Sequence, residues 1–318
     1  MSEVIKEHEL LSNYQKLNNS FRKKTLIYRI GFRYGFFSEY NNMIFAMLYC
    51  LENKMRFVLY SKHANFSYEK GWNDYFMPFC EESSDNFHFK HNYRDPLSTT
   101  FFERNHFYVY LYKMIHPNHF LTFKLWDKFR NKINESKTYN IPELGINGNF
   151  LDACRKLVYL TWDYNPETQK NIHSLISSVR LPENYIGIHI RRGDKAIETE
   201  AIPASKYIDN IQKMSNIKHI FVSTDDYNVI NEIKEHYKDL ILYYLCKKEE
   251  TGYDQLNFNN LSAQSKKTDM ELLFASVDIL CNSQAFVGTF NSNVGLYVGM
   301  RMPEDKAESV DLEKWQIW

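Results

Sequence analysis

The sequence predicts an α/β protein whose C-terminal half contains a doubly wound parallel sheet. Three short apolar segments, residues 185–190, 219–224 and 285–290, are each followed by a polar loop and a helical pattern. Strands that alternate with helices form parallel sheets with helices on both faces. The length of 318 residues favours two domains over one large core.

The N-terminal half begins with a β-loop-α-β pattern. Residues 25–32 and 55–61 are typical of strands, and residues 43–54 between them indicate a buried helix, introduced by a turn at residues 35–42. The polar segment before residue 25 fits an amphipathic helix or a loosely held arm. Residues 66–150 are rich in aromatics, His and Asn but have weak periodicity, so we expect an irregular, partly helical lobe there.

Helical patterns over residues 151–162 and 166–179, separated at Pro166, lead into the second half of the chain. We therefore expect two domains and a C-terminal tail that packs back on the first domain. The expected division is residues 1–175, residues 176–302 and the tail at residues 303–318.

The composition argues against several functional classes. The 39 Lys and Arg balance the 39 Asp and Glu, so we expect no nucleic-acid partner and at most peripheral contact with a membrane. The five cysteines lack a C-x-x-C pair, which disfavours a disulfide framework or a zinc site and fits a reducing cytoplasm. The N-terminus carries charges where a signal peptide needs an apolar core, and the longest apolar run is too short to cross a bilayer.

Polar residues leave each predicted strand at the edge where ligands bind in an open parallel sheet. The first strand ends in the run from His189 to Lys195, which includes the adjacent Arg191 and Arg192. Guanidinium groups match the oxygens of a phosphate, so this loop suits a diphosphate. The alternative is a solvated turn in which Arg192 and Asp194 pair with each other.

The other two strand exits have a similar character. Asp225 and Asp226 follow the second strand, where they either serve a ligand or cap the next helix. The third strand leads through Thr289 and Phe290 to Ser292, where hydroxyl and backbone N–H groups suit an anion. The alternative at the third exit is an ordinary helix N-cap.

Further acidic residues lie between these strands. The run from Thr268 to Glu271 indicates a capping box, in which Asp269 complements the helix dipole. Glu198 and Glu200 lie in the loop after the first strand, where a carboxylate can act as a general base on a hydroxyl. The alternative is a solvated pair that only adds charge.

These runs resemble the GDP-fucose-dependent fucosyltransferases, and most closely the α-1,6-fucosyltransferase family, which includes a rhizobial nodulation-factor enzyme. That family has a strand, then H-x-R-R-x-D-K and a nearby T-E-A, as at residues 189–195 and 199–201. Its second motif is similar to residues 221–226, and its Asp-led helix before a T-F-S-S turn is similar to Asp269 and residues 289–292.

The resemblance covers residues 185–302, whereas over residues 1–170 only the loop from Gly31 to Glu39 is similar to these enzymes. It implies a GT-B-like fold, with two Rossmann-like domains that face each other across a cleft, the acceptor side first and the nucleotide-sugar donor side second. It also implies inverting transfer of fucose from GDP-fucose to a glycan hydroxyl. Alternatives are a related inverting transferase that uses another sugar nucleotide, and a non-catalytic nucleotide-sugar or glycan-binding protein.

The resemblance assigns roles residue by residue. Arg191 would hold the β-phosphate, His189 and Asp269 would contact guanine, and Glu200 would be the base with Lys195 beside it. The implied donor-binding set is His189, Arg191, Arg192, Asp194, Asp225, Asp226, Asp269, Thr289, Phe290 and Ser292. One extra residue before the T-E-A makes Glu198 a competitor for the base role, and the segment between Asp269 and Thr289 is longer than in the family.

Two further expectations concern the cofactor and the acceptor. Arginine and helix N-termini can neutralise a departing diphosphate, and no D-x-D run occurs, so we expect no metal ion or other cofactor. An acceptor glycan would stack on aromatic residues of the lobe at residues 66–150, such as Trp72 or Tyr75, unless these form the core. The sequence leaves the linkage, the acceptor and the oligomeric state open.

Overall fold

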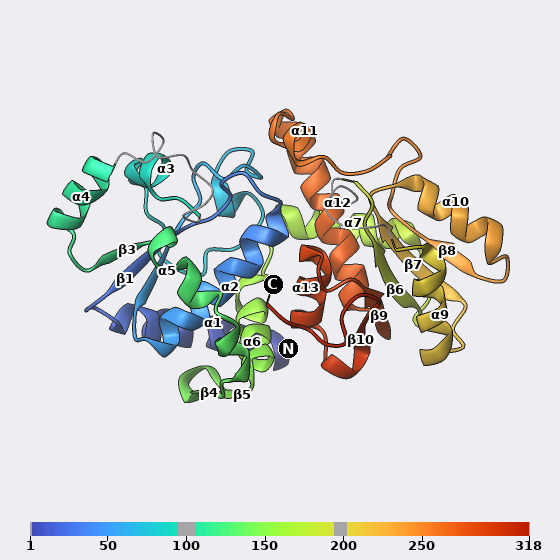
Figure 1. Ribbon diagram of the computed structural model, residues 1–318, viewed down its shortest axis with the longest axis horizontal. Coiled ribbons are helices and arrows are strands. Elements are labelled where there is room, and N and C mark those ends of the chain that lie inside the picture. The colour runs from blue at the N-terminus through green and yellow to red at the C-terminus, as the bar shows by residue number, and fades with distance from the viewer. Residues whose placement is uncertain (1, 95–105, 194–201, 318) are drawn as a thin grey trace. The chain divides into compact units, whose positions relative to one another are not determined.

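A computed structural model describes residues 2–94, 106–193 and 202–317 (Figure 1). The chain divides into two compact units: unit 1 runs to Asn165 and includes Ile317, and unit 2 runs from Pro166 to Gln316. The division therefore comes at the start of helix α7 (Pro166–Val179), whereas the sequence placed it inside that helix, between residues 175 and 176. The difference arises because α7 packs along α12, a helix of unit 2.

Unit 1 is built on a three-stranded parallel sheet of order β2-β1-β3. Strands β1 (Thr25–Arg29) and β2 (Arg56–Tyr60) flank helix α2 (Phe36–Glu52), which confirms the predicted β-loop-α-β unit. Strand β3 (His119–Leu121) comes from the lobe where the sequence indicated no strand. Its three residues are too few to give a periodic signal.

The rest of unit 1 is mainly helical, as expected for an irregular lobe. Its further elements are α1 (Ser2–Ser20), η1 (Gly71–Asp74), α3 (Phe87–His91), α4 (His106–Ile115), α5 (Thr122–Phe129), η2 (Lys132–Ser136), β4 (Tyr139–Ile141), η3 (Pro142–Leu144), β5 (Ile146–Gly148) and α6 (Phe150–Thr161). Trp72 and Tyr75 are fully buried, and the Trp72 ring stacks on Phe76 at 4.4 Å. These aromatics form core, so they are not a surface on which a glycan stacks.

Unit 2 contains a five-stranded parallel sheet of order β10-β9-β6-β7-β8. The predicted strands are confirmed as β6 (Ile186–Ile190), β7 (His219–Thr224) and β9 (Ala285–Gly288). The short edge strands β8 (Ile241–Tyr243) and β10 (Ala307–Ser309) were not predicted. Because β10 and the 3₁₀ helix η4 (Glu304–Lys306) belong to unit 2, most of the tail joins this unit. Ile317 alone is grouped with unit 1, where its N–H donates to Glu135 Oε1 at 2.6 Å.

Helices cover both faces of this sheet, as a doubly wound fold requires (Figure 1). The helices of unit 2 besides α7 are α9 (Ala204–Met214), α10 (Tyr227–His236), α11 (Gln255–Asn259), α12 (Ala263–Cys281) and α13 (Asn293–Arg301). Isoleucines of β6 pack against Ile208 of α9 and Ile230 of α10 in one apolar cluster. In the described part of the chain, no helix combines the length and apolar composition that a membrane crossing needs.

The capping box expected at residues 268–271 is wrong. Helix α12 starts earlier, and the side chain of Ser262 caps it by accepting the N–H of Ser265 at 3.2 Å. Thr268 therefore lies inside the helix, where its hydroxyl donates to the carbonyl of Gln264 at 3.1 Å. The added first turn is polar, and an ion pair between Lys267 and Glu167 of α7 helps to hold it.

Candidate active site

The three polar strand exits lie at one edge of the unit 2 sheet. The register pairs His189 of β6 with Ser223 of β7, and Ile188 of β6 with Val287 of β9. Strands β7 and β8 lie on one side of β6, and β9 and β10 lie on the other. In doubly wound sheets, ligands bind at such a switch point, at the carboxyl ends of the strands. The candidate site is therefore the edge where β6, β7 and β9 end.

His189 lies near the end of β6 and is buried. Its Nδ1 contacts the hydroxyl of Ser223 at 3.2 Å, and its Nε2 is buried without a hydrogen-bond partner among the described residues. Burial, and then the nearby charge of Arg191, lowers the pKa of His189 to about 3, so the ring is neutral at pH 7. A neutral ring with an unpaired buried nitrogen suits a polar ligand group more than a phosphate.

The two adjacent arginines that follow β6 are in different surroundings. The Arg191 guanidinium lies over the ring of Tyr253, 5.6 Å from its centroid, within the range of a cation–π contact. Arg192 instead donates through Nη1 to the carbonyl of Ile202 at 2.6 Å and lies 3.9 Å from a carboxylate oxygen of Glu232. Arg192 is thus directed toward Ile202 and Glu232, whereas Arg191 is directed toward Tyr253.

The side chain of Asp225 links the loop after β6, which contains Arg191 and Arg192, to the loop after β8. Its Oδ1 accepts the N–H of Arg192 at 2.8 Å, and its Oδ2 accepts the N–H of Tyr253 at 3.1 Å. The two backbones approach closely because both have a glycine there: a Cβ on Gly193 would lie 2.4 Å from the Tyr253 carbonyl oxygen, and Gly252 has a φ of +120°. Asp225 therefore positions the loop that presents Arg191.

Asp226 has the capping role that was the alternative reading of this position. Its side chain accepts the N–H of Asn228 at 2.9 Å at the start of α10. A carboxylate at a helix N-terminus satisfies an otherwise unpaired N–H and complements the helix dipole. Asp226 thus stabilises the helix that follows β7.

The turn after β9 is held by hydrogen bonds among its own residues and to Asp311. Ser292 is buried, caps α13 by accepting the N–H of Gly295 at 3.0 Å, and donates to the carbonyl of Thr289 at 2.9 Å. The N–H of Phe290 donates to Asp311 at 2.9 Å. Thr289 and Phe290 are also buried. The hydroxyl of Ser292 already uses its one proton inside the turn, so its phosphate contact stays a prediction.

Asp269 lies on the exposed side of α12, in the N-terminal half of that helix. Because the C-terminal end of α12 leads into the start of β9, its N-terminal half lies toward the edge where the strands end. Asp194, Lys195, Glu198 and Glu200 lie outside the described residues. Their predicted roles therefore rest on the sequence.

Two residues of the site were not anticipated from the sequence. Tyr253 lies in the loop after β8, and its sequence signal was the glycine that precedes it. Asp311 accepts the N–H groups of Phe290 and Asn291 from just beyond β10. Tyr253 and Asp311 follow the edge strands β8 and β10. Because the sequence pattern did not predict these strands, it did not predict that the residues after them belong to the site.

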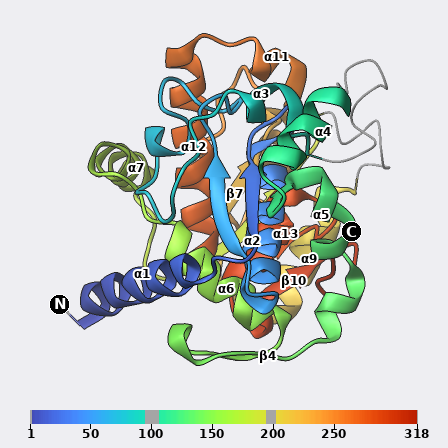
Figure 2. The same ribbon diagram turned by 90° about the vertical axis from the view of Figure 1, so that its left-hand side faces the viewer.

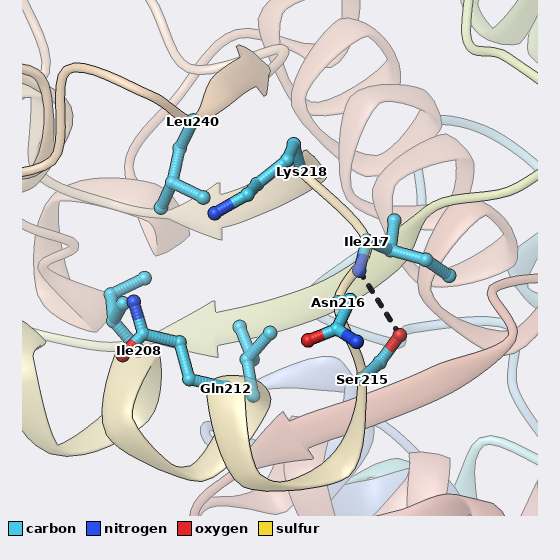
Figure 3. A pocket seen from close by; sticks show the side chains of 8 residues that line it. Ile208, Gln212, Ser215, Asn216, Ile217, Lys218 and Leu240 are labelled. Carbon is cyan, nitrogen blue, oxygen red and sulfur yellow. Dashed lines mark hydrogen bonds between the residues drawn. The ribbon is translucent and has the colours of Figure 1, made fainter.

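A pocket of about 220 Å³ lies elsewhere in unit 2 (Figure 3). It is lined by the last turn of α9, by Lys218 before β7 and by Leu240 before β8. These residues belong to the amino ends of the strands, opposite the candidate site. Among the described residues, no group of His, Cys, Asp and Glu side chains is arranged to hold a metal ion.

Comparison with known proteins finds one similar family. Residues 153–298, just under half of the chain, match the family model of the alpha-(1,6)-fucosyltransferase N- and catalytic domains. Over this segment the chain is similar to the GDP-fucose fucosyltransferases. The similarity supports glycosyltransferase activity, and the matched segment includes β6, β7, β9 and most of α13. No curated protein matches the sequence.

Solved structures similar to this chain confirm its fold. The α-1,6-fucosyltransferase NodZ soaked with GDP-fucose has a TM-score of 0.52 and 13% identity, covering 89% of this chain and 94% of that one. Fucosyltransferase NodZ from Bradyrhizobium has a TM-score of 0.52 and 12% identity, with the same coverage. The match with NodZ co-crystallised with GDP has a TM-score of 0.52 and 13% identity, covering 89% and 93%. The predicted GT-B fold is thus confirmed, whereas the facing of the domains across a cleft stays a prediction.

Proposed function

We propose that this fucosyltransferase transfers fucose from GDP-fucose to a hydroxyl of a glycan acceptor, with inversion at the sugar carbon. The observation that carries the proposal is the common edge of β6, β7 and β9. There the exit of β6, with His189 and Arg191, is next to the exit of β9, which leads to α13. These residues lie inside the segment that matches the fucosyltransferase family. NodZ, which has the same fold, was co-crystallised with GDP and soaked with GDP-fucose.

In this proposal, Arg191 stabilises the negative charge that develops on GDP as the sugar leaves. A preorganised guanidinium acts most strongly where charge appears in the transition state. The start of α13, which follows the neighbouring strand β9, adds a positive dipole end at the same edge of the sheet. Thr289, Phe290 and Ser292 form the turn that leads into it. Arg192 and Asp225 hold the loop, Asp226 holds α10, and His189 contacts guanine through its buried Nε2.

The general base that takes the acceptor proton is Glu200, with Lys195 and Asp194 in the same loop and Glu198 as its competitor. The support is the T-E-A resemblance together with the position of the loop directly after Gly193. A base on one side of the sugar and a leaving group stabilised on the other side is the arrangement that inversion needs. Asp269 is proposed to contact guanine from α12.

Asp225→Asn tests the positioning role derived above. The Asn side chain has one acceptor oxygen, so it can accept only one of the N–H groups of Arg192 and Tyr253, and its NH₂ group faces the other. Leaving a buried N–H without an acceptor costs about 1–3 kcal/mol of stability. We expect kcat/KM for GDP-fucose to fall by about tenfold, which corresponds to about 1.4 kcal/mol. Asp226→Asn is the matched control, because Asn caps a helix as well as Asp does. Steady-state kinetics of both variants measure the difference, and equal losses in the two would refute the role of Asp225.

Transfer is proposed to need no metal ion or other cofactor. Arg191 and the α13 terminus supply the positive charge that a divalent cation would otherwise provide. We expect the rate of GDP-fucose consumption to be the same in excess EDTA and in millimolar Mg²⁺ or Mn²⁺. A loss of most activity in EDTA that returns on adding either ion would contradict this expectation.

A screen of sugar-nucleotide consumption tests the function itself. The purified chain is incubated with GDP-fucose, GDP-mannose, UDP-glucose and UDP-N-acetylglucosamine, and nucleoside diphosphate release is measured with and without acceptor glycans. Of the four donors, we expect only GDP-fucose to release nucleoside diphosphate, and we expect a suitable acceptor to raise the rate of release. Release from a different donor would favour the related transferase, and GDP binding without any release would favour a binding protein.

All five cysteines are unpaired, which supports the proposed cytoplasmic location.

A further inference from the structure

Helix α4 of unit 1 exposes an apolar stripe. Its outward side chains are between 37% and 73% exposed. They are Phe107, Tyr108, Tyr110, Leu111, Met114 and Ile115. Their spacing of three and four residues places them on one face of the helix. Helix α4, drawn in green, lies at the left-hand end of unit 1 in Figure 1 and on the side that faces the viewer in Figure 2.

The opposite face of α4 fixes this orientation. Tyr112 is buried, stacks on Phe87 of α3 with ring centroids 4.1 Å apart, and bonds through its hydroxyl to His119 at 2.9 Å. Tyr112 packs in one cluster with Ile27 and Val58 of the sheet. The outward stripe is therefore the face that remains once α4 is packed on unit 1.

Basic groups flank the stripe on both sides. On one side, Lys113 lies 4.3 Å from the ring centroid of Phe120, and Lys124 is near enough to help lower the pKa of Lys113, whose main cause is burial. On the other side, the ring of Tyr108 lies 5.3 Å from that of His91, which is next to Lys90. Burial, and then Lys90, lower the pKa of His91, so the positive charge around the apolar side chains comes from Lys90, Lys113 and Lys124.

Negative charge is missing from these segments. Residues 86–94 and 106–124 contain no Asp or Glu, and the acidic residues nearest to them in sequence, up to α4, are Asp85, Asp95 and Glu103. Asp85 raises the pKa of the inward Tyr112, after the larger effect of burial. The stripe thus has the local positive charge that the chain as a whole lacks.

We propose that the outward face of α4 docks on the surface of a membrane that contains anionic lipids. Phe, Tyr, Met and Ile side chains on one helix face can enter the boundary between headgroups and acyl chains, while flanking Lys side chains contact phosphates. The flanking charge distinguishes this occupant from a second copy of the chain, whose same face would carry the same positive groups. Docking of this kind would bring unit 1 to acceptors or products located at a lipid surface.

Vesicle flotation of the full chain tests the proposal. We expect the protein to float with vesicles of phosphatidylcholine and phosphatidylserine, to float far less with phosphatidylcholine alone, and to detach as the salt concentration rises. The triple substitution Phe107→Ser, Met114→Ser and Ile115→Ser should weaken binding to the mixed vesicles by about tenfold or more, because it removes the apolar contact. Lys113→Gln with Lys90→Gln should weaken it without changing the apolar face.

The matched control removes the same kind of exposed apolar side chain elsewhere. Met77, Ile133 and Leu256 are 40%, 63% and 74% exposed, and their replacement by Ser should leave vesicle binding unchanged. Thermal unfolding and GDP binding verify that each variant is folded. Equal binding of the α4 triple variant and the parent would overturn the proposal, as would equal binding to neutral vesicles. It would also be overturned if the stripe supported only a concentration-dependent dimer, seen as a mass increase that the triple variant abolishes.

Discussion

We expect Arg191→Ala to lower kcat/KM for GDP-fucose by about 10²–10³-fold, or about 2.7–4 kcal/mol, the usual loss when one preorganised donor to a developing negative charge is removed. The effect follows from the position of Arg191 directly after β6, at the switch point of the sheet, with its guanidinium over Tyr253. The midpoint of thermal unfolding should change little, because the side chain is only partly buried. Steady-state kinetics and a melting curve on the same preparation measure both quantities.

Two companion variants sharpen this prediction. Arg191→Lys keeps the charge but loses the planar fork, so its activity should lie between that of the parent and that of Arg191→Ala. Arg192→Ala removes the hydrogen bond to Ile202 and the contact with Glu232, so its main effect should be a lower unfolding midpoint. If Arg191→Ala keeps the turnover of the parent, Arg191 does not stabilise the leaving group.

Glu200→Gln should remove transfer while GDP still binds. A general base contributes about 10²–10⁴-fold to the rate, and the amide of Gln cannot accept the acceptor proton. The nucleotide site proposed at β6 and β9 does not include this carboxylate, so the dissociation constant for GDP should change little. Product formation with an acceptor glycan, together with a calorimetric GDP titration, separates the two effects.

Glu198→Gln is the internal control for the base, because both glutamates lie in the same loop and carry the same charge. We expect Glu198→Gln to be active and Glu200→Gln to be inactive. If Glu198→Gln is the inactive variant, the extra residue before the T-E-A has shifted the register and Glu198 is the base. If both variants transfer fucose at the parent rate, neither glutamate is the base.

Much of the fold was predictable because its central strands are continuous apolar runs. Strand β6 is buried along its whole length, and the β6, β7 and β9 segments each contrast with the polar loop that follows. The edge strands β8 and β10 were missed because three residues with partly exposed side chains give no periodic pattern. The start of α12 was misplaced because a polar first turn, held by tertiary contacts, resembles a loop in sequence.

The candidate site was predictable as a set of strand exits, but the direction of individual side chains was not. Adjacent arginines look alike in sequence, and only packing shows that Arg192 turns toward Ile202 while Arg191 lies over Tyr253. Asp225 and Asp226 were equivalent candidates in the sequence. In the structure Asp225 links two loops, whereas Asp226 caps helix α10. Asp311 braces the turn after β9 from about twenty residues away, a contact that no local pattern specifies.

Hydrogen exchange with and without GDP shows where the nucleotide binds in the intact chain. We expect GDP to slow amide exchange at residues 189–193, in the loop around Tyr253 and in the turn at residues 289–292, and we expect Arg191→Ala to reduce this protection. Protection confined to other parts of the chain, or none at a GDP concentration that saturates binding, would contradict this expectation.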